Sequence, residues 1–263
     1  MKSVKTIFSI IMVMIFLSAC GDQRGIYYGD GTIDVKGKNT IYNTMTISPG
    51  TTVTFYPVTI NFGIGLFGGY ENGELIIGSG GKLLAQGTKD KIITFEAGSI
   101  TFNSDASNES IMEYCEFKEG VVVSISNSMT VQYCKFNGDR WLLVYGNSNI
   151  KYNTFNTVGI GIYDNSAPLI YYNHIDLTNP AYTFAGIDIR MSVVQPDIKY
   201  NNIINVQNYA IYYESTSSSI TVDSNYIANC NGKIGVDTTG EQSLNVIYIN
   251  PQTSLITGAG CGW

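Results

Sequence analysis

The chain has very few of the residues that build metal centres. His174 is the only histidine among 263 residues, and no two of the 5 cysteines have the C-x-x-C spacing of a zinc site. A zinc site is therefore not expected, and we predict neither a resident metal nor a cofactor.

Charge, proline and helical patterning are scarce as well. Charged residues make up 14% of the chain, only 6 residues are proline, and the net charge is −6. An acidic surface disfavours nucleic acid as a partner. The composition also excludes a disordered or collagen-like chain. Few segments show helical periodicity, whereas 19 tyrosines accompany abundant Asn, Thr, Ser and Ile, which predicts an all-β protein.

One long apolar run is present, and it lies near the N-terminus. Residues 7–17 follow Lys2 and Lys5 and are too few to span a bilayer as a permanent helix, a pattern typical of a secretory signal. The run ends in Leu-Ser-Ala-Cys20, which resembles the bacterial lipobox. That resemblance implies cleavage before Cys20 and lipidation of its thiol; the alternative is an ordinary cleaved signal.

These features predict the location of the protein. We expect a lipoprotein signal peptide at residues 1–19, a lipid-anchored linker at 20–30, and an exported lipoprotein held to a membrane of the bacterial cell envelope. Each buried CH₂ of an acyl chain contributes about 0.8 kcal/mol, so several chains on one residue anchor a protein firmly. Which membrane holds the lipid stays open.

A six-residue motif recurs through the rest of the chain. Its third position is Tyr in five copies, its fourth is Cys or Asn, and its sixth is Phe or Ile. The fourth positions are 19, 19, 20, 28 and 24 residues apart. The six copies occupy residues 112–117, 131–136, 150–155, 170–175, 198–203 and 222–227.

This spacing predicts two short strands bent around a corner, with each corner stacked on the one before. Equivalent side chains then form columns with a spacing of about 4.8 Å, and stacked Asn amides can hydrogen-bond along such a column. A further apolar stretch after each corner indicates about three strands per coil. The chain thereby resembles the right-handed parallel β-helix of the pectate-lyase-like superfamily. We predict a single-stranded solenoid over residues 31–263, about ten coils long, with residues 250–263 capping its C-terminal end.

The outward residues of one predicted sheet form a candidate binding strip. One column should contain Tyr145, Tyr163, Arg190, Glu214 and Asp237, with Asp188 and Tyr212 beside it. Tyrosine rings could stack on sugar faces while the charged groups contact hydroxyls or carboxylates, so we predict polysaccharide binding at this strip. The alternative is a solvated face on which Arg190 and Glu214 form an ordinary cross-strand pair.

The same strip raises the question of catalysis. Asp188, Glu214 and Asp237 should have carboxyl separations of about 5 to 8 Å, which glycosidases also use. The three carboxylates could instead hold Ca²⁺, with Arg190 as the base of a polysaccharide lyase, the role that the resemblance implies. The chain lacks the Asn-Thr-Asp, Asp-Asp and Gly-His-Gly set of polygalacturonases and the Asp-Pro-His-Glu of alginate epimerases. We therefore expect a non-catalytic envelope protein that presents a face for polysaccharide or surface binding, with a lyase or hydrolase, or a structural spacer or adhesin, as alternatives.

Two cysteines replace Asn in adjacent copies of the motif. The Cα atoms of Cys115 and Cys134 should be about 4.8 Å apart, inside the disulfide range. Side chains stacked in parallel register point the same way, however, and this would strain a bridge. We expect buried thiols here, and leave the state of Cys230 and Cys261 open. His174, beside the Asn column, is expected to be solvated.

Overall fold

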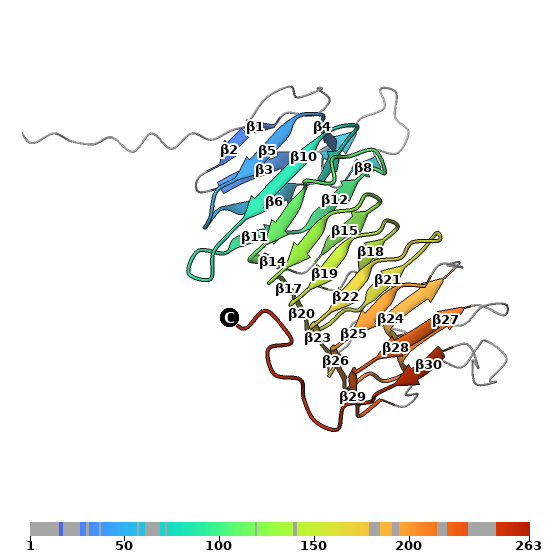
Figure 1. The fold of residues 1–263 in the computed structure, drawn as a ribbon. Coiled ribbons are helices and arrows are strands. Elements are labelled where there is room, and N and C mark those ends of the chain that lie inside the picture. The colour runs from blue at the N-terminus through green and yellow to red at the C-terminus, as the bar shows by residue number, and fades with distance from the viewer. Residues whose placement is uncertain are drawn as a thin grey trace, which may run out of the picture.

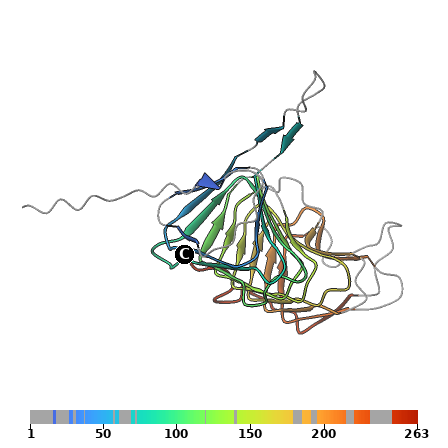
Figure 2. The same cartoon turned by 90° about the horizontal axis from the view of Figure 1, so that it is seen from above.

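The computed structural model describes residues 16–17, 27–29, 32–36, 38–56, 58–60, 69–71, 73–118, 120–138, 141–178, 185–190, 195–214, 220–230 and 246–263. The regular elements among these residues are all β-strands, and most belong to three parallel sheets. The strands are stacked along one axis (Figure 1), and the view from above shows successive coils winding around a common interior (Figure 2). The protein is a right-handed parallel β-helix, as the motif predicted.

The three sheets run the length of the stack, and their strands follow in coil order. Sheet 1 contains β1 (Phe16–Leu17), β3 (Thr32–Lys36), β6 (Thr52–Tyr56), β11 (Ile93–Glu96), β14 (Cys115–Phe117), β17 (Lys135–Phe136), β20 (Thr154–Phe155), β23 (His174–Asp176), β26 (Asn202–Ile204) and β29 (Tyr226–Ala228). Sheet 2 contains β2 (Tyr27–Gly29), β5 (Thr44–Ile47), β10 (Lys82–Gln86), β13 (Ile111–Glu113), β16 (Thr130–Gln132), β19 (Asn149–Lys151), β22 (Leu169–Tyr171), β25 (Asp197–Lys199), β28 (Ile220–Asp223) and β30 (Val246–Ile249). Sheet 3 contains β4 (Lys38–Ile41), β9 (Glu74–Ile77), β12 (Gly98–Phe102), β15 (Val121–Ile125), β18 (Leu142–Val144), β21 (Ile160–Ile162), β24 (Ala185–Arg190) and β27 (Tyr209–Glu214).

Each coil passes through sheet 2, sheet 1 and sheet 3 before the next begins. The coil that starts at β19 continues through β20 and β21 and is followed by β22, which lies directly against β19. The pairing is parallel and in register, with Ile150 opposite Ile170. Ten strands in each of two sheets agree with the predicted number of coils. One antiparallel hairpin, β7 (Val58–Ile60) with β8 (Gly69–Glu71), projects from the stack (Figure 2).

The tyrosines of the motif form the corner between sheet 2 and sheet 1. Five consecutive corners place Tyr in the left-handed region, with φ between 49° and 58°: Tyr114, Tyr133, Tyr152, Tyr172 and Tyr200. Such a conformation costs a non-glycine residue roughly 1–2 kcal/mol. The five rings stack with centroids 5.1 to 5.3 Å apart, and each stacked pair contributes about 0.5–1.5 kcal/mol. Stacking therefore offsets much of the strain of the corner.

The Asn residues at the fourth position of the motif form a buried column. Asn153, Asn173, Asn201 and Asn225 are all 0% exposed. The Oδ1 of each accepts the backbone N–H of the equivalent residue one coil earlier, at 2.8 to 3.0 Å. The Nδ2 of each donates to a main-chain carbonyl of that earlier coil, also at 2.8 to 3.0 Å. The amides thus join each coil to its neighbour and satisfy polar groups that would otherwise be buried without partners.

The cysteines of the motif take the place of Asn as donors. Cys134 Sγ lies 3.6 Å from the carbonyl oxygen of Met112, the position equivalent to Val131, whose carbonyl accepts from Asn153 Nδ2. Cys115 is buried, and burial followed by the neighbouring Cys134 raises its thiol pKa well above the ordinary value. All four described cysteines, Cys230 and Cys261 included, are free, which confirms the prediction of buried thiols for the pair.

The interior contains columns of apolar side chains, one of which is built of a single residue type. Phe95, Phe117, Phe136 and Phe155 stack across four coils with centroids 4.6 to 5.1 Å apart. The outward assignment of the strip implies that the alternate residues of sheet 3 point inward, and those the structure describes are buried: Leu142, Val144, Ile160, Ile162, Ile187, Ile189, Ile211 and Tyr213. The alternation of inward and outward side chains therefore follows the strands as predicted.

The C-terminal segment does not cap the end of the solenoid, so that expectation is wrong. It runs back along the outside of sheet 1 toward the N-terminal coils (Figure 1). Its hydrogen bonds reach progressively earlier coils: Gln252 N to Asn225 O (3.0 Å), Ile256 N to Asn202 Oδ1 (2.8 Å), Gly260 N to Tyr172 O (2.8 Å), Cys261 N to Thr154 Oγ1 (3.0 Å) and Trp263 Nε1 to Tyr133 O (2.8 Å). Lys135 Nζ lies 4.0 Å from the centre of the Trp263 ring. Residues 250–263, the C-terminal strap, therefore join several coils from outside.

The strap also changes the environment of His174. This residue is half-buried in β23, and a Cβ on Gly260 of the strap would lie 3.1 Å from the His174 Cβ. Burial lowers the pKa of His174, an effect that Asp176 partly offsets. The expectation of a solvated histidine is therefore wrong, because the strap runs past it.

The predicted signal and anchor lie largely outside the described residues. Cys20 is not among them, and of residues 1–19 only β1 is described, where Phe16 lies opposite Asp34 of β3. Removal of residues 1–19 would leave β3 as the first strand of sheet 1. No helix in the described part of the chain has the length and apolar character needed to cross a bilayer.

The Asn column can be tested by removing one amide. Asn173→Ala should lower the free energy of unfolding by about 3 kcal/mol, because it leaves the Asn153 N–H and the Ile150 carbonyl buried without their partners. Asn208→Ala, at an exposed turn position, serves as the matched control and should change little. Urea denaturation followed by circular dichroism measures both. Equal stability of the two variants would contradict a structural role for the column.

The C-terminal strap can be tested by truncation. Deleting residues 251–263 should lower the free energy of unfolding by about 2 kcal/mol or more, since several hydrogen bonds between coils are lost. Leu255→Ala, which shortens a side chain that is 55% exposed, keeps those bonds and should leave stability nearly unchanged. Chemical denaturation of both variants gives the comparison. A truncated protein as stable as the full chain would show that the strap carries no stability.

Candidate functional site

The outer face of sheet 3 arranges the predicted strip as the sequence indicated. Parallel register places Asp188 between Gly161 and Tyr212, one coil on either side. Arg190 lies opposite Glu214 in the same pair of strands. Asp237 lies outside the described residues, so the strip consists here of Tyr145, Tyr163, Asp188, Arg190, Tyr212 and Glu214.

Asp188 and Arg190 form the charged centre of this face. Arg190 Nε lies 3.0 Å from both carboxylate oxygens of Asp188, and a second guanidinium nitrogen lies 2.9 Å from Oδ2. Both residues point outward from β24, two positions apart. Asp188 is only 2% exposed. Burial raises its pKa above the ordinary value, while the hydrogen bonds and charge of Arg190 counteract that rise.

The alternative to a binding strip was an ordinary cross-strand pair of Arg190 and Glu214, which do lie opposite each other, but the described close contacts of Arg190 are with Asp188 of its own strand. Glu214 is exposed at the end of β27, and its charge raises the pKa of Asp188, as a nearby like charge should. The geometry favours Asp188 because outward residues two apart on one strand lie on the same side of the sheet.

Tyr212 is part of the strip but is not accessible. Its side chain is 2% exposed, so it cannot offer a free ring face to a ligand without rearrangement. The Arg190 guanidinium lies 6.0 Å from the centre of its ring, and the Tyr209 ring is tilted against it at 5.5 Å. The prediction of Tyr212 as a stacking platform therefore needs correction: this ring packs on the sheet and supports Arg190.

The accessible aromatic part of the strip is the pair Tyr145 and Tyr163. The two rings stack with centroids 5.3 Å apart, and both residues are half-buried. Gly161 makes room for this arrangement, because a Cβ there would lie 2.7 Å from Tyr163 Cε2. Burial, followed by the charge of Asp188, raises the pKa of Tyr163. The tyrosine hydroxyl is thus kept in its neutral form, able to donate a hydrogen bond.

A polar hollow adjoins this pair, and sequence reasoning missed it. It has a volume of about 540 Å³ and is lined by Asn103, Ser104, Asp105, Ser126, Tyr145 and Asp164. Each of these residues follows the end of a sheet 3 strand on successive coils: β12, β15, β18 and β21. The sequence does place polar residues directly after each apolar stretch, which could have indicated this hollow. Such residues are also typical of ordinary turns, however, and so did not single it out.

The described geometry gives little support to catalysis at the strip. The hydrogen bonds to Asp188 raise the pKa of Arg190, which keeps the guanidinium protonated and therefore unable to accept a proton as a base. The described residues contain no group of three or more acidic, Cys or His side chains placed to hold a metal ion. The separations predicted for Asp237, and with them the proposed Ca²⁺ triad, lie outside the described residues.

Known proteins do not identify the chain further. No family model, no curated protein and no solved structure matches it, and so the functional argument is drawn from this geometry.

Proposed function

We propose that this chain is an exported, lipid-anchored protein of the bacterial cell envelope that binds polysaccharide on the outer face of sheet 3 without catalysing a reaction. The observation that carries the proposal is the stacked pair of Tyr145 and Tyr163, of which Tyr145 lines a polar hollow. The lipobox-like residues before Cys20 support the anchor.

The chemistry of this region suits a sugar. Aromatic rings offer apolar faces on which the C–H groups of a sugar can pack. Beside them, Asn103, Ser104 and Ser126 supply amide and hydroxyl groups, and Asp105 and Asp164 supply carboxylate acceptors. This mixture of apolar faces and paired donors and acceptors matches the alternation of C–H and O–H groups on a sugar ring.

The solenoid favours a polymer over a single sugar. Equivalent positions recur along the axis at about 4.8 Å per coil, so an extended chain lying along the stack would contact several coils at once. Arg190 and Glu214 lie on the coils that follow Tyr163 and would add charged contacts at one end. We also propose that the chain belongs to the pectate-lyase-like superfamily, on the strength of its coil repeat.

Binding without catalysis is favoured because the two central charged groups of the strip, Asp188 and Arg190, neutralise each other. Asp188 is buried and paired with Arg190, so neither is free to act as an acid or a base. The motifs of the polygalacturonases and of the alginate epimerases are also missing from the sequence.

The binding strip can be tested with two tyrosine variants. A glycan array identifies the polysaccharide, and titration then measures its affinity. Tyr145→Ala and Tyr163→Ala should each weaken binding about tenfold, because one aromatic contact and its share of buried surface are lost. Tyr42→Ala removes a tyrosine that is 42% exposed on an N-terminal coil and should not change the affinity. The absence of any glycan bound above background would overturn the proposal.

The anchor can be tested separately. In a bacterial host fed radiolabelled palmitate, the wild-type chain should incorporate the label and remain with the membrane fraction. Cys20→Ser should abolish labelling, since lipid attaches to the cysteine thiol. Cys230→Ser serves as the control, because this half-buried thiol lies in the described solenoid far along the chain. Labelling that survives Cys20→Ser would exclude the predicted lipid site.

A further inference from the structure

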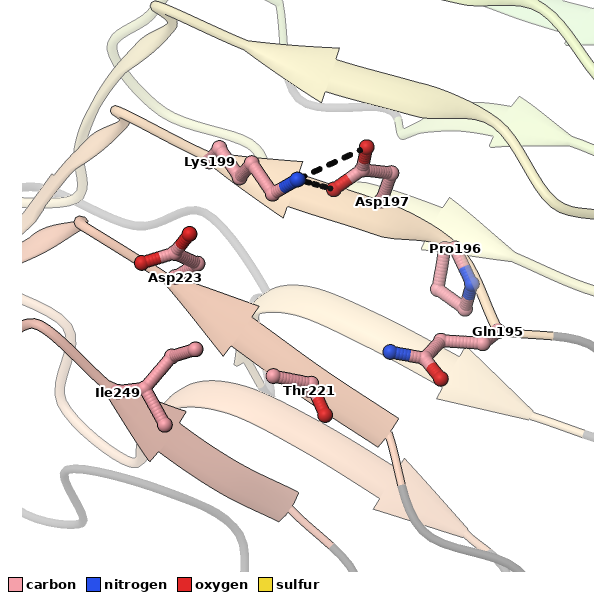
Figure 3. A pocket seen from close by; sticks show the side chains of 7 residues that line it. All are labelled: Gln195, Pro196, Asp197, Lys199, Thr221, Asp223 and Ile249. Atoms are coloured by element: carbon pink, nitrogen blue, oxygen red, sulfur yellow. Dashed lines mark hydrogen bonds and ion pairs between the residues drawn. The ribbon is translucent and has the colours of Figure 1, made fainter.

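A second hollow lies on another face of the solenoid, at the C-terminal end of sheet 2. It has a volume of about 390 Å³ and is lined by Gln195, Pro196, Asp197, Lys199, Thr221, Asp223 and Ile249. Figure 3 shows that these side chains come from three successive strands, β25, β28 and β30, and from the residues just before β25. Parallel register places Lys199 opposite Asp223, and Asp223 opposite Ile249.

The lysine of this hollow is already neutralised. Lys199 Nζ lies 3.0 Å from Asp197 Oδ1 and 3.3 Å from Oδ2, and Figure 3 shows the ammonium directed at that carboxylate. The hydrogen bond that Lys199 donates to Asp197 raises the pKa of Lys199. Asp197 also accepts a hydrogen bond from the hydroxyl of Tyr171 on the preceding coil. The ion pair is therefore satisfied within the protein and offers little to an anion.

The carboxylate of Asp223 is the charged group of the hollow that remains available to a ligand. Its Oδ1 accepts hydrogen bonds from Ser224 Oγ at 2.8 Å and from Asn250 Nδ2 at 2.9 Å. Those bonds, with a smaller contribution from the charge of Lys199, lower the pKa of Asp223, so the carboxylate stays ionised. Within the described part of the chain, its other oxygen, Oδ2, has no hydrogen-bond donor. Because the charges of Asp197 and Lys199 cancel each other, the hollow carries one uncompensated negative charge, that of Asp223.

The remaining lining residues supply both polar and apolar contacts. Figure 3 shows the Gln195 amide extending toward Thr221 across the hollow. Neither the Gln195 amide nor the Thr221 hydroxyl hydrogen-bonds to another described residue, so both can serve a ligand. The Pro196 ring and the Ile249 side chain, which belongs to a residue 39% exposed, add small apolar surfaces.

We infer that this hollow binds a small organic cation: a protonated primary amine on a hydroxylated ring, as in an amino sugar. The ammonium would donate to Asp223 Oδ2, and ring hydroxyls would pair with Gln195 and Thr221. The C–H face of the ring would lie against Pro196 and Ile249. This site is on a different sheet from the tyrosine strip and selects the opposite charge to a uronate, so it stands apart from the proposed polysaccharide site.

The inference can be tested by comparing three sugars that differ in charge. Glucosamine, N-acetylglucosamine and glucuronate are titrated into isotopically labelled full-length protein, and backbone amide shifts are followed by NMR. Glucosamine should shift resonances of β25, β28 and β30 in a saturable way. N-acetylglucosamine and glucuronate should bind at least about tenfold more weakly, because neither brings a cation to Asp223.

Two variants and two controls make the test specific. Asp223→Asn keeps the shape and removes the charge, so glucosamine binding should weaken at least about tenfold. Gln195→Ala removes an exposed amide without touching the coil contacts and should weaken binding severalfold. Asp90→Asn, an exposed carboxylate in the turn between β10 and β11, should bind like wild type. Tyr163→Ala should also retain glucosamine binding, which separates this site from the strip.

The outcomes decide the inference either way. Selective glucosamine binding that is lost in Asp223→Asn and weakened in Gln195→Ala supports it. Absence of saturable glucosamine shifts at these strands, equal binding of the three sugars, or binding unchanged in Gln195→Ala and in a folded Asp223→Asn would each overturn it.

Discussion

The structure depends on the hydrogen bonds that join one coil to the next at the corner between sheets 2 and 1. A solenoid cannot bury a polar corner unless each buried amide finds partners above and below it. The Asn column meets this requirement because one side chain both accepts from and donates to the earlier coil. Where Cys134 replaces Asn, the thiol donor reaches the equivalent carbonyl, so the contact to the preceding coil is kept.

The left-handed tyrosines follow from the same constraint. A sharp corner needs a residue with positive φ, and most side chains avoid that conformation. Stacking turns one unfavourable residue per coil into a continuous column of rings, whose mutual contacts counteract the strain. On the inside of the solenoid, Phe rings also stack from coil to coil. Equivalent residues therefore support each other only while the coils remain in register.

That register also organises the outer surface. Because the coils are aligned, an outward residue on one strand becomes the neighbour of its equivalents on adjacent strands, and Tyr145 and Tyr163 stack for this reason. The turns after sheet 3 collect polar residues at one edge of the stack, next to that pair. The C-terminal strap uses the same alignment, since its hydrogen bonds go to positions that repeat along sheet 1. Some charged side chains form ion pairs with a neighbour two residues away on the same strand: Asp188 with Arg190, and Asp197 with Lys199.

The fold class, the number of coils, the direction of side chains in sheet 3 and the columns of Tyr and Asn could all be predicted from the repeat in the chain. This was possible because a solenoid brings together residues one repeat apart, and a repeat of 19 to 28 residues is visible in a single chain. The pairing of Arg190 with Asp188, the burial of Tyr212 and the path of the C-terminal strap along sheet 1 became known only from the folded chain. These features depend on side-chain conformation and on contacts between segments up to 130 residues apart, such as Trp263 with Tyr133, and no local pattern encodes such contacts.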